Sequence, residues 1–206
     1  MLEPENIRQL SLLKPDLIGF IFFPGSPRYV AGKLDPVVVK EIPADIIKTG
    51  VFVNEAYEEI EKTAKLFGLD AVQLHGVESP ELCRSLKAVG FKVIKAFHPK
   101  EPADMTACAA YEGKCDLFLF DTPSKAYGGS GKKFDWGLIG MYKGSTPFML
   151  SGGIGPGDEE MIGRLQLPLL IGIDLNSRFE TAPGVKNIEQ LKRFFDNTRK
   201  QTKTQA

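Results

Sequence analysis

Three turns rich in glycine or small polar residues follow apolar, β-branched runs in this chain of 206 residues. Backbone N–H groups in such turns can converge on an anion, and glycine lets the main chain approach it closely. The sequence therefore predicts a phosphorylated small-molecule substrate. The candidate phosphate-binding residues are Gly129 within 128–131, Gly152 and Gly153 after Met149-Leu150-Ser151, and Asn176 and Ser177 after the last apolar run.

Four polar side chains lie at or near the ends of apolar runs, where the chain can present them to a ligand. Asp121 ends one run directly before a glycine-rich turn, and its alternative role is a cap for that turn or for the next helix. Gln73 and His75 alternate on one run and therefore point to the same side. They either contact the ligand or form a hydrogen-bonded core pair. Asp174 ends the last run, and both a ligand contact and a structural role are open.

The elements that position these residues alternate between short apolar runs and segments of helical period. Continuous apolar runs are typical of parallel strands that are covered on both faces. The clearest helices are expected at 56–67, 80–88, 158–165 and 188–199, so the pattern indicates βα units in one domain over residues 1–206, with a polar tail at about 200–206. The expected strands are Leu17–Phe23, Thr49–Val53, Ala71–His75, Val93–Phe97, Leu117–Asp121, Phe148–Ser151 and Leu169–Asp174.

Composition excludes several other classes of protein. The 26 basic and 26 acidic residues balance, which argues against nucleic acid or an anionic membrane as a partner. The N-terminus has no signal-peptide pattern and no apolar run approaches 18 residues, so we expect a cytoplasmic protein. Cys83, Cys108 and Cys115 have no CxxC spacing, which indicates buried free thiols and no metal site.

Several motifs, in order and at matching spacing from about Glu3 to Phe195, resemble the phosphoribosylanthranilate isomerase family of tryptophan biosynthesis. The resemblance implies a single-domain (β/α)8 TIM barrel that acts without a metal or an organic cofactor. It also implies an Amadori rearrangement of N-(5'-phosphoribosyl)anthranilate to the 1-deoxyribulose 5-phosphate aminoketose. The motifs are Gly19–Phe22 with Ser26–Tyr29, Gly50–Asn54, Ala71–Gly76, Ile94–Phe97, Gly128–Gly131 with Phe134–Trp136, Ser151–Gly153 and Pro183–Lys186.

The resemblance also assigns roles to residues of this chain. Asp121 matches the family's general acid, which protonates the ring oxygen when the furanose opens. Arg28 matches the arginine that holds the anthranilate carboxylate, and a surface arginine in a Ser-Pro turn is the alternative. Gln73, His75 and Asp174 are expected near the sugar or the aromatic amine. The glycines, Asn176 and Ser177 named above are expected at the phosphate.

One family feature is missing from these 206 residues. Family members begin with a strand that ends in Cys-Gly, and its cysteine is the general base, whereas seven strands can be read here. We therefore expect an open barrel wall, with the first strand missing, and impaired activity. The alternatives are a non-catalytic barrel that binds a phosphorylated ligand, and another phosphate-binding barrel enzyme of tryptophan or histidine biosynthesis. The sequence leaves monomer and homodimer open.

Overall fold

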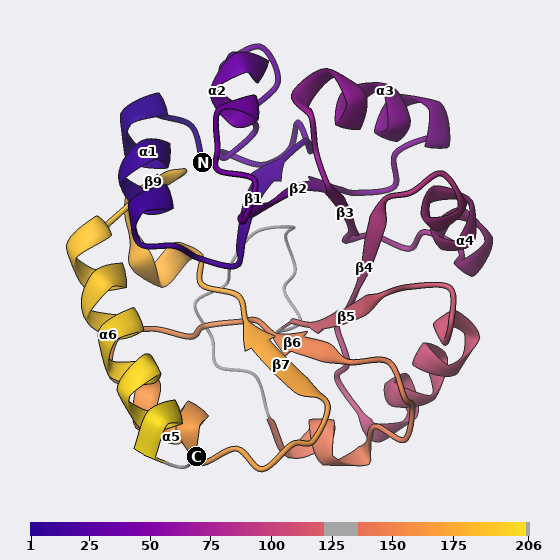
Figure 1. Ribbon diagram of the computed structural model, residues 1–206. Coiled ribbons are helices and arrows are strands. Elements are labelled where there is room, and N and C mark those ends of the chain that lie inside the picture. Colours follow the sequence, from indigo (N-terminus) through magenta and orange to yellow (C-terminus); the bar gives the residue numbers. More distant parts are fainter. Residues whose placement is uncertain (122–135, 205–206) are drawn as a thin grey trace.

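The computed structural model describes residues 1–121 and 136–204, and its centre is one parallel sheet of seven strands. The strands lie in chain order, and each pairs in parallel with the next. Figure 1 shows the sheet curled around a common axis, with the helices outside it. The strands are β1 (Leu17–Ile21), β2 (Ile47–Phe52), β3 (Ala71–Leu74), β4 (Lys92–Phe97), β5 (Leu117–Phe120), β6 (Phe148–Leu150) and β7 (Leu170–Ile173).

The strands form where the sequence has short apolar runs, because a parallel sheet must be covered on both faces. All four residues of β3 are buried, and Phe20, Phe52, Phe118 and Phe120 are among the largest fully buried side chains. Ile94, Ala96 and Leu119 form a second, smaller cluster of buried residues. All seven predicted strands are confirmed, and no strand end differs from its predicted position by more than two residues.

Helices cover the outside of the sheet, and two of them have typical capping residues. The Ser79 side chain accepts a hydrogen bond from the Leu82 N–H at the start of α4, and Gly68 ends α3 in the left-handed conformation. The last helix continues to Thr204, past the predicted end at Arg199. The helices are α1 (Pro4–Leu12), α2 (Pro36–Lys40), α3 (Tyr57–Phe67), α4 (Pro80–Ala88), η1 (Pro102–Tyr111), η2 (Trp136–Met141), α5 (Glu159–Gly163), η3 (Ser177–Phe179) and α6 (Ile188–Thr204).

The sheet has two edges, β1 and β7, and no described strand joins them. This confirms the expected opening in the barrel wall. Outside the opening, α1 and α6 lie side by side (Figure 1), and Arg199 Nη2 donates to the carbonyl oxygens of Leu13 and Lys14. A short antiparallel hairpin, β8 (Glu180–Ala182) with β9 (Val185–Lys186), follows η3, and the Leu2 N–H donates to the Gly184 carbonyl.

Cys83, Cys108 and Cys115 are free and buried, as predicted. Among the described helices, none has both the length and the apolar character that a membrane span needs.

Candidate functional site

Four polar side chains stand at one end of the sheet because each directly follows a strand. His75 follows β3, Asp121 follows β5, Ser151 follows β6 and Asp174 follows β7. The backbone N–H of each donates to the neighbouring strand, namely to the carbonyl oxygens of Phe52, Phe97, Phe120 and Leu150 in that order. The hydrogen-bond ladder of the sheet therefore fixes the backbone from which all four side chains project.

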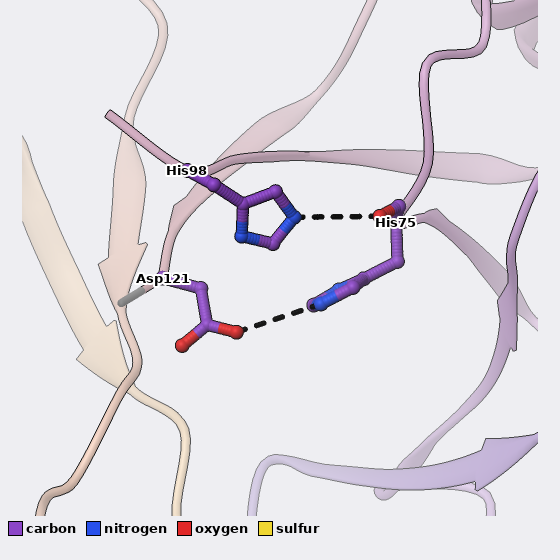
Figure 2. Close-up of side chains that lie close together, drawn as sticks. All are labelled: His75, His98 and Asp121. Carbon is purple, nitrogen blue, oxygen red and sulfur yellow. Dashed lines mark hydrogen bonds and ion pairs between the residues drawn. The ribbon is translucent and has the colours of Figure 1, made fainter. Parts of the chain in front are cut away.

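Asp121 lies at the centre of this group. His75 Nε2 is 3.5 Å from Asp121 Oδ2. Figure 2 marks this pair with a dashed line. Burial favours the protonated form, but hydrogen bonds from His75 and Ser151 and the charge of His75 outweigh it, so the pKa of Asp121 lies below its usual range. The ligand-free carboxyl is thus ionised at neutral pH.

Asp174 has the opposite electrostatic environment. Burial and the nearby charge of Asp121 together raise the pKa of the Asp174 carboxyl. Ser151 Oγ lies 3.1 Å from Asp174 Oδ2 and is also within hydrogen-bond reach of Asp121, so its single hydroxyl proton can be donated to either carboxyl group. Ser151 therefore links two carboxyl groups whose pKa values are shifted in opposite directions.

The structure brings Gln73 and His75 into contact. Gln73 Nε2 is 3.0 Å from His75 Nδ1, so both side chains lie on the same side of β3 and its extension. This contact leaves the other ring nitrogen, Nε2, directed toward Asp121. Gln73 therefore sets the orientation of the His75 ring.

Arg28 belongs to a second group of charges, formed with the β8–β9 hairpin. Its Nε and Nη2 donate to Glu180 at 2.6 to 3.0 Å, and the two side chains are only 11% and 4% exposed. Lys186 Nζ contacts Glu180 Oε1 at 3.3 Å, the Leu175 carbonyl at 3.2 Å and Asn176 Oδ1 at 2.9 Å. Asn176, a predicted phosphate residue, therefore already holds a cation with its side chain.

Of the other predicted phosphate-binding residues, one lies outside the described part of the chain and three lie within it. Gly129 lies outside the described residues. Gly152 and Gly153 follow β6 with φ of 94° and 69°, a left-handed conformation that glycine adopts readily, and Ser177 begins η3. Within the described residues, the backbone N–H groups of Gly152, Gly153 and Ser177 donate no hydrogen bond. These three donors are therefore free to bind an anion.

Several residues of the site were not singled out from the sequence. Glu180 carries no signal of its own, because its partner Arg28 lies 152 residues away in the chain. Lys186 lies in the quoted motif Pro183–Lys186, which is the signal that could have identified it. Ser151 likewise lies in a quoted motif, Ser151–Gly153, whereas His98 is visible in the sequence only as a residue that follows an apolar run.

The fold and the placement of these side chains define a class of protein, the parallel βα barrel enzymes, which build their sites at the carboxyl ends of the strands. Residues 2–197 match the family model described as N-(5'-phosphoribosyl)anthranilate (PRA) isomerase. The chain belongs to this family of isomerases.

Known relatives and solved structures agree with this assignment. An N-(5'-phosphoribosyl)anthranilate isomerase of Phocaeicola vulgatus is 48% identical over 187 residues, which cover 91% of this chain and 89% of that protein. The same-named protein of Parabacteroides distasonis is 46% identical over 197 residues, covering 94% and 88%. The phosphoribosyl anthranilate isomerase structure from Thermotoga maritima superposes with a TM-score of 0.84 at 34% identity, covering 97% and 96% of the two chains.

A further solved structure is relevant to ligand binding. It is a phosphoribosyl anthranilate isomerase in complex with reduced 1-(o-carboxyphenylamino)-1-deoxyribulose 5-phosphate, with a TM-score of 0.81 and 30% identity, covering 97% of this chain and 95% of that one. Together these neighbours confirm the TIM-barrel fold class predicted from the sequence.

Proposed function

We propose that this protein converts N-(5'-phosphoribosyl)anthranilate to 1-(2-carboxyphenylamino)-1-deoxyribulose 5-phosphate. The observation that carries the proposal is Asp121 at the carboxyl end of β5, flanked by His75 and Ser151, in a chain of the isomerase family. A cytoplasmic location fits a biosynthetic step on a small phosphorylated molecule.

Asp121 acts as the general acid in this proposal. It donates a proton to the ring oxygen as the bond between that oxygen and C1' breaks, and the nitrogen lone pair forms the C1'=N double bond. A base then removes the C2' proton, which gives an enolamine. The enolamine becomes the aminoketose when the C2' hydroxyl loses its proton and C1' gains one.

The ionised state of ligand-free Asp121 must change when the substrate binds. The substrate brings a phosphate and a carboxylate and displaces water, and both effects favour protonation of a nearby carboxyl group. The hydrogen bonds through Ser151 connect Asp121 to Asp174, the carboxyl with the raised pKa. Asp174 and Ser151 thus provide a route for the proton.

The two ends of the substrate are assigned to different parts of the edge. The phosphate binds the N–H groups of Gly152, Gly153 and Ser177, and Gly129 is proposed to join them. The anthranilate carboxylate binds Arg28 through Nη1, which makes no hydrogen bond within the described residues. Gln73, His75 and Asp174 line the space between, beside the sugar and the amine.

The general base is proposed to come from a strand outside these 206 residues that fills the opening between β1 and β7. Cys83 lies in α4, Cys108 in η1 and Cys115 just before β5, so none reaches the carboxyl end of the sheet. The 206-residue chain alone should therefore convert the substrate slowly. Asp174 is the first candidate for the base if it does not.

Replacement of the Asp121 carboxyl group by an amide tests its role as the general acid. In a protein that carries the added strand, Asp121→Asn should lower kcat by about 10²- to 10⁴-fold while the product still binds, because a positioned acid contributes that much. The matched control is Asp196→Asn on the exposed face of α6. Near-normal turnover of Asp121→Asn would remove this residue from the mechanism.

The oligomeric state is proposed to be monomer or homodimer. A solved structure of engineered monomers of the dimeric phosphoribosylanthranilate isomerase from Thermotoga maritima, 30% identical to this chain, supports both forms for the fold.

A further inference from the structure

His75, His98 and Asp121 converge in space although they follow three successive strands, β3, β4 and β5. One nitrogen from each ring and one carboxylate oxygen all lie within 4.8 Å of one another. Figure 2 shows the two rings and the carboxylate around a common space. The rings pack edge to face with their centroids 4.8 Å apart. These are the only two histidines of the sequence.

The surroundings of the two rings leave a nitrogen of each available as a ligand. Gln73 holds His75 at Nδ1, and His75 Nε2 faces Asp121. If the Gln73 amide turns over, its oxygen accepts from Nδ1–H and the Nε2 lone pair becomes free. His98 Nε2 lies 3.4 Å from the His75 carbonyl oxygen, which leaves Nδ1 of His98 as the ring nitrogen for a metal ion. A neutral imidazole is the form that binds metals.

We propose that His75, His98 and Asp121 bind one divalent transition-metal ion of the Zn²⁺ type. Two imidazole nitrogens and a carboxylate oxygen are ligands that zinc accepts, and three protein ligands leave a fourth position open to solvent or to a ligand. Bond lengths of about 2.1 Å place tetrahedral ligands about 3.4 Å apart. The contact between His75 and Asp121 is already 3.5 Å, so His98 is the group that moves most.

A bound ion inhibits the isomerase. This consequence rests on the proposed function, because a carboxylate that ligates zinc cannot carry the proton that opens the ring. The metal is therefore an inhibitor of this site and takes no part in the rearrangement.

Metal binding can be measured without any turnover. The 206-residue chain is titrated with Co²⁺ and followed by its visible absorption, and Zn²⁺ is then added as the competitor. A saturable spectrum at one ion per chain is expected, without the near-ultraviolet thiolate band that the cysteines would give. His98→Asn should weaken binding by more than about 100-fold, since loss of even an outer partner of a zinc ligand costs 10- to 100-fold. Asp196→Asn is the control and should bind as the unmodified chain does.

Equal affinity for the unmodified chain and His98→Asn, or no saturable binding below millimolar metal, overturns the site. Inhibition is tested separately on the strand-extended protein, as the ratio of turnover with and without Zn²⁺ for the unmodified and His98→Asn forms. A chelator should restore the turnover of the unmodified form. Zn²⁺ should leave the turnover of His98→Asn nearly unchanged. Metal binding without any isomerase activity would contradict the proposed function and would still support the metal site. Equal inhibition of the unmodified and His98→Asn forms would contradict the inhibitory role of this site.

Discussion

Arg28 is held in place before any ligand arrives. Its fork is bidentate to Glu180, and Lys186 supports the same carboxylate from the other side. The planar guanidinium therefore has a fixed direction, and a ligand carboxylate need not order it on binding. Lysine could supply the charge at this position but not the fork.

Substitution of Arg28 should separate the two ends of the ligand. Arg28→Lys should weaken binding of the anthranilate-bearing product by about 10- to 100-fold, because a charge-assisted pair is worth about 1.5–3 kcal/mol. Binding of inorganic phosphate should change little. Calorimetric titration of both ligands measures this, with exposed Arg8→Lys as the control. Equal losses of affinity for product and phosphate would mean that Arg28 acts through folding or through the overall electrostatic field of the protein.

Glu180 should make the stability of the folded protein depend on pH in the acid range. Burial opposes its ionisation, but Arg28 and Lys186 outweigh burial and lower the pKa of Glu180 below its ordinary value. A carboxyl with a lowered folded pKa contributes stability above its unfolded pKa, and the contribution is lost as pH falls through the folded pKa. The stabilisation from Glu180 should thus be complete at pH 7 and should fade below about pH 4.3.

Unfolding by urea at pH 7 and pH 3 tests this difference. Glu180→Gln should destabilise the protein by about 3 kcal/mol at pH 7, since it breaks a buried ion pair. The difference should be smaller at pH 3, because the stabilisation from the ionised Glu180 side chain is lost progressively below its unfolded pKa. Glu189→Gln on α6 is the exposed control. A difference that is the same at both pH values would show that the charge of Glu180 is not what stabilises the fold.

At the scale of elements, one buried ion pair holds the turn after β3. Lys95 on β4 and Glu78 are 2% and 1% exposed, and Lys95 Nζ also donates to the carbonyl oxygens of Leu74 and Gly76. Glu78 in turn accepts from the backbone N–H groups of Asn54 and Gly76. The pair thereby ties the segments after β2 and β3 to β4, and it fixes the segment that presents His75.

A double-mutant cycle measures this pair. Lys95→Met should destabilise the protein by about 3–5 kcal/mol, because it leaves Glu78 as an uncompensated buried charge. Lys95→Met with Glu78→Gln should recover part of the loss. Chemical denaturation of the four proteins gives the coupling energy, and the exposed pair Arg193 with Glu189 should give a far smaller one. Additive losses for Lys95 and Glu78 would show that the pair does not act as a unit.

The elements could be predicted to different degrees for physical reasons. Most sheet strands lie on largely apolar runs, so their positions follow from the sequence. The hairpin β8–β9 is missed because strands of three and two residues have no period to detect. Helix ends are less well defined, and α5 ends at Gly163, two residues before the predicted end.

At the scale of the molecule, the edge where the candidate residues gather could be predicted, but their partners could not. Asp121, His75 and Asp174 end apolar runs, and parallel strands place such ends together. Glu180 pairs with Arg28 across 152 residues of chain and Lys95 pairs with Glu78 across 17, and both pairs depend on which segments the folded sheet places side by side. The contact of Gln73 with His75 is local and follows from strand alternation.

The opening between β1 and β7 makes a prediction about stability. Within the described residues no strand pairs with the outer edge of β1 or β7, and only an isolated bridge joins Ile21 to Tyr29. The Met1 amine is buried, and burial lowers its pKa to about 5. A strand added before Met1, ending in Lys-x-Cys-Gly, should pair both edges and turn the amine into a peptide N–H. Thermal unfolding should then rise by at least about 5 °C. A flexible Gly-Ser extension of equal length is the control, and an equal rise from it would contradict strand pairing.

The most direct measurement is turnover of phosphoribosylanthranilate, followed by loss of its fluorescence, for three proteins. These are the 206-residue chain, the strand-extended chain, and the extended chain with serine in place of the added cysteine. The extended chain should isomerise the substrate, and the other two should be slower by at least about 10²-fold, because each lacks the positioned base. No turnover by the extended chain would contradict the proposed function, and equal turnover by all three would contradict the assignment of the base.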